Sequence, residues 1–171
     1  VGILNADFIQ SVDYYASAFP ASRGNALSGV FDFRQKQGNR ERLTGRAVVG
    51  ASDLALTLDG PLGDSTSFIL SARRSYLQFL FDVLGLPFLP TYTDFQLKAR
   101  HDLDGQSSLT LVGLGAIDRS ELNTEIDEPD EQQQYVLNYL PEYDQWNYAA
   151  GAVYTHFHGN QSFSNWVLSR N

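Results

Sequence analysis

The stretch that decides the fold is Thr93-Asp94-Phe95-Gln96-Leu97-Lys98-Ala99-Arg100. Apolar and polar residues alternate along it without a break. In an extended chain successive side chains point to opposite faces, so Phe95, Leu97 and Ala99 share one face and the polar residues share the other. The stretch therefore predicts a β-strand, continuing to Leu103, with one apolar and one polar surface.

Six further segments repeat this pattern, although segment 108–117 is more apolar and its two faces are less distinct. Including the first stretch, each is about 8–14 residues long, which matches the ~9–11 residues that a tilted strand needs to cross a bilayer. The segments are 43–50, 53–61, 66–74, 108–117, 145–158 and 162–169.

The connections between these segments alternate between short and long. Strong turn formers mark three short connections, which are 62–65, 104–106 and 159–161. The intervening connections are 51–52, 76–91 and 119–143, and two of these three are long. Outer-membrane barrels have tight turns on one side and long loops on the other, which a soluble sandwich has no reason to copy.

Residues 1–40 follow a different pattern. Segment 3–12 predicts a short helical turn with Asn5 or Asp7 as its N-cap, and 11–15 predicts a short strand. A loop of small residues at 20–26 precedes another strand at 29–36. We therefore expect two domains: a small mixed α/β unit over 1–40 and a mainly β region over 41–171.

Composition excludes several classes of protein. The net charge of −8 argues against nucleic acid as a partner, because phosphate binding needs a basic surface. No run of 18 apolar residues exists, which excludes a transmembrane helix. The absence of cysteine excludes disulfides and thiolate metal sites. A first residue of valine and the absence of methionine suggest a chain that was processed or cut from a longer one.

Several motifs in order resemble a known family. The stretches are 4–15, 28–36 (Ser-Gly-Val-Phe-Asp-Phe-Arg-Gln-Lys), 53–63 (Asp-Leu-Ala-Leu-Thr-Leu-Asp-Gly-Pro-Leu-Gly), 71–76, 92–98 and 111–118. Over about residues 3–118 the chain resembles the end of the plug and the first barrel strands of a TonB-dependent outer-membrane receptor of the Bacteroidetes-type branch.

The resemblance implies an antiparallel transmembrane β-barrel wall in the bacterial outer membrane, with about seven strands of a larger barrel. The C-terminal part of a plug precedes it. Such receptors have about 22 strands, so this chain is expected to be a fragment. Expected partners are outer-membrane lipid, a TonB-type energy-transducing complex whose contact segment lies outside this chain, and a surface lipoprotein lid. The ligand would be an external glycan, peptide or siderophore, and no cofactor is implied.

Two other functions remain open from the residues alone. A soluble secreted β-sandwich could bind glycans through its aromatic residues, because alternation does not by itself distinguish a barrel from a sandwich. A structural barrel subunit of a larger envelope complex would also fit. The decisive observation is whether the apolar side chains Phe68, Leu70, Phe95 and Leu97 face outward or pack against a second sheet.

Ligand contacts are sought in the two long connections. Arg73 and Arg74 precede the first of them, and we expect Arg73 to point inward at the rim and Tyr76 to lie beside it. Segment 76–86 has apolar residues at helical spacing and predicts a short helix ended by Pro87 and Pro90. Gln132 and Tyr135 are candidate ligand contacts in the second connection.

Metal binding and catalysis have weaker signals. His156 and His158 share a strand face, which is compatible with a metal ion or with an interfacial rim, and a third His is not near in sequence. The acidic stretch Glu125, Asp127, Glu128, Asp130 and Glu131 lacks calcium-loop spacing and predicts a solvated loop. No serine lies in a Gly-x-Ser-x-Gly elbow and His101 has no assigned partner, so we expect neither a metal site nor an enzyme.

Overall fold

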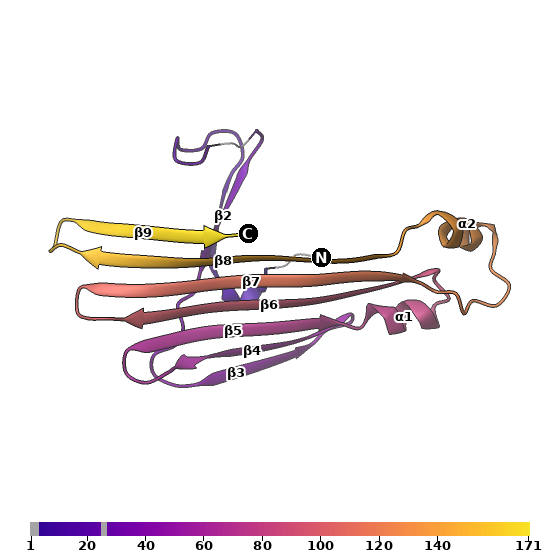
Figure 1. The fold of residues 1–171 in the computed structure, drawn as a ribbon, viewed down its shortest axis with the longest axis horizontal. Coiled ribbons are helices and arrows are strands. Elements are labelled where there is room, and N and C mark those ends of the chain that lie inside the picture. The colour runs from indigo at the N-terminus through magenta and orange to yellow at the C-terminus, as the bar shows by residue number, and fades with distance from the viewer. Residues whose placement is uncertain (1–3, 25–26) are drawn as a thin grey trace.

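The computed structural model describes residues 4–24 and 27–171, and its main feature over that part of the chain is one antiparallel sheet (Figure 1). The start of the predicted helical turn (residue 3) and part of the small-residue loop (25–26) lie outside the described residues. Each strand of this main sheet pairs with its neighbours in sequence. In order the strands are β3 (Thr44–Val49), β4 (Asp53–Pro61), β5 (Thr66–Ser75), β6 (Phe88–Asp102), β7 (Ser107–Leu122), β8 (Tyr143–Phe157) and β9 (Phe163–Arg170).

The register aligns residues of like polarity in two adjacent rungs of β4, β5 and β6. Leu58, Leu70 and Leu97 pair in turn across β4, β5 and β6. In the adjacent rung, Thr57, Ser71 and Gln96 also pair in turn. We call the surface that carries Leu97 the apolar face and the surface that carries Gln96 the polar face. The predicted alternation is thus confirmed in β4–β6.

Burial on this sheet is the reverse of that in an ordinary soluble protein. Ser71 and Gln96 on the polar face are only 1% and 2% exposed. Phe95 and Leu97 on the apolar face are 49% and 40% exposed. Soluble proteins bury apolar side chains and leave most polar ones in water. The sheet therefore turns its apolar face outward and covers its polar face.

A small N-terminal unit contacts the polar face. It consists of a single 3₁₀ turn η1 (Ala6–Phe8) and a two-stranded antiparallel hairpin of β1 (Ile9–Tyr15) and β2 (Val30–Gln35). The Asn5 side chain accepts a hydrogen bond from the backbone N–H of Asp7 and so caps the turn, as the sequence predicted. The tip of the hairpin projects away from the main sheet (Figure 1).

Hydrogen bonds join this unit to the sheet. Asn5 Nδ2 donates to Ser71 Oγ at 2.6 Å and to Thr57 Oγ1 at 3.3 Å. Lys98 Nζ donates to the carbonyl oxygen of Gln35 at 3.1 Å. Two buried apolar residues accompany these bonds: Phe8 in the unit is 1% exposed, and Ile69 on the polar face of β5 is 2% exposed. The attachment is therefore a hydrogen-bonded surface with one buried aromatic ring.

Gly38 provides a test of how closely the N-terminal segment approaches the sheet. A Cβ atom at this position would lie 2.5 Å from the backbone N and O of Phe68 in β5. Backbone atoms in a paired strand cannot move aside easily, so we expect Gly38→Ala to cost about 1–3 kcal/mol in overpacking. The measurement is the urea midpoint of the purified full-length protein. Gly24→Ala is the control, because a Cβ there meets nothing within 4 Å.

The connections segregate by length between the two ends of the sheet. Short turns join β4 to β5, β6 to β7 and β8 to β9 at one end, while both long connections lie at the other end with β3–β4 (Figure 1). The predicted asymmetry in the lengths of the connections is confirmed.

The β6–β7 turn is held by a local hydrogen bond. Donation from the backbone N–H of Gln106 to Asp104 holds the pKa of that carboxyl below its usual value.

Both long connections contain a helix, and only one of these was predicted. The expected helix in 76–86 is α1 (Leu77–Val83). The second connection was expected to be a loop over 119–143, but β7 continues to Leu122 and α2 occupies Glu131–Tyr139. Over residues 4–24 and 27–171, no helix is long and apolar enough to span a membrane.

Pro90 was wrongly assigned as a helix terminator. It lies inside β6, which begins at Phe88 rather than at Thr93, and α1 has already ended before Gly85 at a φ of +65°. The backbone N–H of Tyr92 points to the β5 side, where it donates to Ser75 Oγ at 2.8 Å. Residue 90 points its nitrogen to the same side, beyond the end of β5, so proline removes no ladder hydrogen bond there.

Candidate functional site

A buried ion pair on the polar face uses Arg73, one of the predicted contact residues. Arg73 Nε donates to Asp94 Oδ2 at 2.8 Å, and the side chains are 15% and 4% exposed. The guanidinium carbon also lies 5.3 Å from the ring centroid of Tyr92. The pair forms because Arg73 and Asp94 are direct partners in the β5–β6 register. Arg73 therefore lies on the polar face and contacts its own sheet.

The same network continues to the next strand. Tyr92 Oη donates to Asp53 Oδ2 at 2.6 Å, which joins β6 to β4 across the intervening strand β5. Arg74 lies on the opposite face, where its guanidinium donates to Thr93 Oγ1 at 2.7 Å. The two arginines therefore point to opposite faces of the sheet. Together these contacts fix the ends of β4, β5 and β6 next to the long connections.

Tyr76, a second predicted contact residue, holds the beginning of α1 in place. Its hydroxyl donates to the carbonyl oxygen of Gly50, and its backbone N–H donates to the carbonyl of Ser52 at 2.9 Å. Both acceptors belong to the β3–β4 connection. Tyr76 therefore anchors one connection to the next, which agrees with the rim position that the sequence suggested.

The two long connections are bound to each other. Asn123, which is 4% exposed, donates through Nδ2 to Asp82 Oδ1 and to the carbonyl of Leu86, both at 3.2 Å. Gln133 Nε2 donates to the carbonyl of Gly85 at 2.8 Å. We call the structure formed by 76–87 and 123–142 the rim. These hydrogen bonds give the rim a defined shape, although it lies outside the regular sheet.

Helix α2 begins with a capping box. Asp130 Oδ1 accepts from the backbone N–H of Gln133 at 2.7 Å, and Gln133 Oε1 accepts from the backbone N–H of Asp130 at 2.8 Å. Two members of the acidic stretch thus have a local role, because Asp130 caps the helix and Glu131 occupies its first turn. In the described part of the chain, no group of three or more His, Cys, Asp or Glu residues could hold a metal ion.

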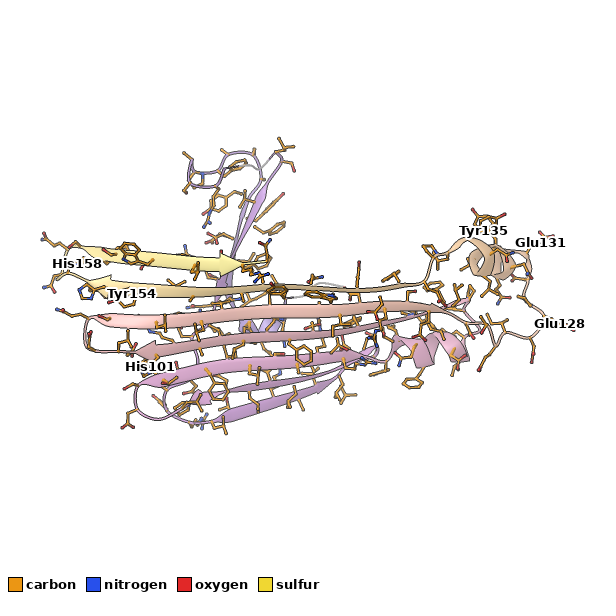
Figure 2. The ribbon with its side chains drawn as sticks, viewed as in Figure 1. His101, Glu128, Glu131, Tyr135, Tyr154 and His158 are labelled. Atoms are coloured by element: carbon orange, nitrogen blue, oxygen red, sulfur yellow. The ribbon has the colours of Figure 1, made fainter. Side chains whose placement is uncertain are left out.

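The exposed surface of α2 carries Glu131, Tyr135 and Tyr139 at successive intervals of four residues. Figure 2 shows Glu131 and Tyr135 together on the outward side of the helix. The rings of Tyr135 and Tyr139 lie 4.8 Å apart at an interplanar angle of 38°, and these residues are 65% and 72% exposed. The other predicted contact, Gln132, is also exposed in the first turn. Ligand contact by Gln132 and by Tyr135 stays a prediction.

His101 and His158 lie at the short-turn end of the sheet (Figure 2), and His156 lies there too, because it pairs with Ser107, the first residue of β7. His101 hydrogen-bonds Thr66 Oγ1 at 2.8 Å, and His156 hydrogen-bonds Ser107 Oγ at 2.8 Å. His158 hydrogen-bonds Ser164 Oγ at 2.7 Å. Each imidazole therefore joins neighbouring strands or the two ends of a turn.

Two functional features were readable in the sequence but were not identified. The spacing Asp130–Gln133 is that of a capping box, and 131, 135 and 139 share one face only if 131–139 is helical. The cross-strand pair of Arg73 with Asp94 had no such signal, because it depends on register.

Comparison with protein-family models, with curated proteins and with solved structures finds no match to this chain. The outward apolar face, the covered polar face and the rim are therefore the features that bear on function.

Proposed function

We propose that this chain is the end of the plug and the first part of the barrel wall of a TonB-dependent outer-membrane receptor. Such a receptor would bind an external nutrient above the plug, and an inner-membrane energy-transducing complex would then rearrange the plug to admit it. The observation that carries the proposal is a continuous apolar band on the outward face of the sheet.

The apolar band is bounded by two rungs. One contains Arg74, Thr93 and Trp146, and the other contains His101, Tyr154 and Trp166. In the described residues of the three rungs between them, the one charged side chain is Arg170, on edge strand β9. These rungs are Ala47-Leu56-Ala72-Phe95-Gly115-Tyr148, Gly45-Leu58-Leu70-Leu97-Gly113-Ala150-Arg170 and Gly60-Phe68-Ala99-Leu111-Ala152-Leu168.

The height and borders of the band fit a bilayer. The bounding rungs are eight residues apart on β8, so nine residues cover the band, which matches the ~9–11 residues of a tilted membrane-crossing strand. Outer-membrane barrels have an apolar band ~25 Å tall between two aromatic girdles. Trp146 stacks on Tyr148 at 5.7 Å at one border, and Tyr154 pairs with Trp166 at the other. Beyond Trp146 the same face becomes charged, with Arg119 bonded to Asp144.

The covered polar face supports a plug. Irregular backbone at membrane depth is tolerated only where protein or water satisfies its polar groups. The N-terminal unit meets this condition through Asn5, Asp7 and Gln35, which bond to side chains of the sheet. Contacts of this kind can be exchanged for water at modest cost, as a plug that must move would require.

The sandwich alternative needs a second sheet against the apolar face. Among the described residues, the other sheet is the two-stranded β1–β2 hairpin, and the contacts of its unit reach the polar face instead. Leu70, Phe95 and Leu97 are 38%, 49% and 40% exposed. This arrangement favours the membrane-embedded wall over the sandwich. No particular observation favours a structural barrel subunit.

The proposal is tested by location and orientation of the full-length natural protein in cells. We expect heat-modifiable protein in the outer-membrane fraction. Gln132→Cys in α2 should react with a membrane-impermeant maleimide on intact cells, whereas Gln106→Cys in a short turn should react only after permeabilisation. Protein in the soluble fraction, or equal labelling at both positions on intact cells, would exclude the proposed wall and its orientation.

A further inference from the structure

We infer that the outward face of α2, made of Glu131, Tyr135 and Tyr139, binds an arginine side chain of a peptide ligand. The inference deepens the proposed function by naming a ligand class at the rim. It rests on that proposal for the external position of the rim, but the geometry of the face stands independently.

The three side chains form one line on the helix. At 3.6 residues per turn, positions four apart lie one above the next, so the Glu131 carboxylate is followed by the Tyr135 ring and then by the Tyr139 ring. On the other side of α2, Gln133 donates to the carbonyl of Gly85, and Val136 and Leu137 are partly buried. The tyrosines thus lie away from the side of the helix that bonds to Gly85, and their tilted ring pair is exposed and open to a partner.

The charge around this face selects a cation. Residues 123–142 contain no Lys, Arg or His. Their acidic members are Glu125, Asp127, Glu128, Asp130, Glu131 and Glu142. A surface of one sign attracts ligands of the opposite sign and speeds their association. A neutral sugar could stack on the two rings but would gain nothing from this charge.

Arginine fits the line of groups better than lysine does. Its planar guanidinium can stack on a tyrosine ring and at the same time present two parallel N–H donors to a carboxylate. On α2 the ring of Tyr135 and the carboxylate of Glu131 are one helical turn apart, so both contacts are available to one side chain. An ammonium group is a compact, strongly hydrated charge and can use only part of this surface.

The face is also fixed before a ligand arrives. The capping box holds the first turn of α2, and Gln133 ties that turn to Gly85 at the end of α1. Asn123 closes the base of the same connection against Leu86. A surface that is already ordered loses less entropy on binding, which favours measurable affinity for a short peptide.

The test measures binding of a fluorescent tetra-arginine amide to the purified full-length protein in detergent, by anisotropy at low ionic strength. We expect tighter binding than for tetra-lysine. Tyr135→Leu should weaken the arginine peptide about 3–10-fold, as expected for loss of a cation–π contact. Glu131→Gln should weaken it about 2–5-fold, as for loss of an exposed ion pair. Leucine and glutamine are good helix formers, so α2 should persist in both variants.

Phe79→Leu is the matched control, because Phe79 is an exposed aromatic on α1, at 66%, with no carboxylate one turn before it. Unchanged binding in Tyr135→Leu, or equal affinity for arginine and lysine peptides, would overturn the inference. If Tyr135→Leu abolishes binding of a neutral oligosaccharide but leaves binding of the arginine peptide unchanged, the inference is overturned in favour of a glycan ligand. If the protein is found outside the outer membrane but still binds tetra-arginine, the receptor proposal is excluded and this inference still holds.

Discussion

Replacing Asp94 with alanine is expected to lower the free energy of unfolding by about 3 kcal/mol, because it leaves the Arg73 guanidinium buried without its carboxylate. Asp94 is the partner of Arg73 at 2.8 Å, and the two side chains are 4% and 15% exposed. Water cannot easily replace the lost carboxylate at such a site. The measurement is the urea midpoint of the full-length protein in detergent, with the slope checked for two-state behaviour.

The chain offers a closely matched control in Asp144→Ala. Arg119 Nε and Asp144 Oδ2 are 2.9 Å apart, but these side chains are 52% and 59% exposed. An exposed pair of this kind contributes about 0–1 kcal/mol. The double replacement Arg73→Met with Asp94→Leu should recover most of the loss, since it removes both buried charges. Equal effects of Asp94→Ala and Asp144→Ala would mean that water reaches the polar face at Asp94, contrary to the fold described above.

Phe8→Ala is expected to have the second large effect, at about 3–5 kcal/mol, because it removes the one fully buried aromatic ring of the N-terminal unit. The loss should appear as release of that unit from the sheet, while the main sheet stays paired. Amide hydrogen exchange, read out by peptide, measures this directly. Peptides from β1 and β2 should exchange faster, and peptides from β5 and β6 should keep their protected backbone.

The control for Phe8→Ala is Phe33→Ala in β2. Phe33 is 42% exposed and lies 6.1 Å from the ring of Phe31, so its truncation should cost no more than about 1 kcal/mol. If the two replacements loosen the unit equally, Phe8 does not hold it to the polar face. Loss of protection throughout β3–β9 would instead mean that the N-terminal unit and the sheet unfold together.

The strands were predictable because apolar and polar residues alternate with a period of two in the sequence. The alternation of Phe95, Gln96, Leu97 and Lys98 requires no knowledge of any partner, and neither do the glycine and aspartate residues of the short turns. The helix α1 was predictable for the same reason, since its apolar spacing is local. Helix α2 was overlooked because its segment has the acidic, polar composition of a loop.

The sequence pattern could not predict that the apolar face is the outward one, because the alternation is the same whichever face of the sheet is covered. What covers Ser71 is Asn5, which lies 66 residues earlier in the chain. The burial of Arg73 likewise depends on the register that places it opposite Asp94. The contact residues Arg73 and Tyr76 were placed near the correct end of the sheet, but their partners within the chain could not be predicted from local sequence.

The neighbour-to-neighbour pairing of β3 through β9 also implies an order of assembly. Closing a loop costs more entropy as it lengthens, and folding is faster when contacts are close in sequence. The hairpins on the three short turns close loops of a few residues, whereas Lys98 reaches Gln35 across 63 residues. The surface that receives the N-terminal unit needs β4, β5 and β6 in register. The N-terminal unit is therefore translated before the main sheet but packs after it, because the later strands form the surface to which it binds.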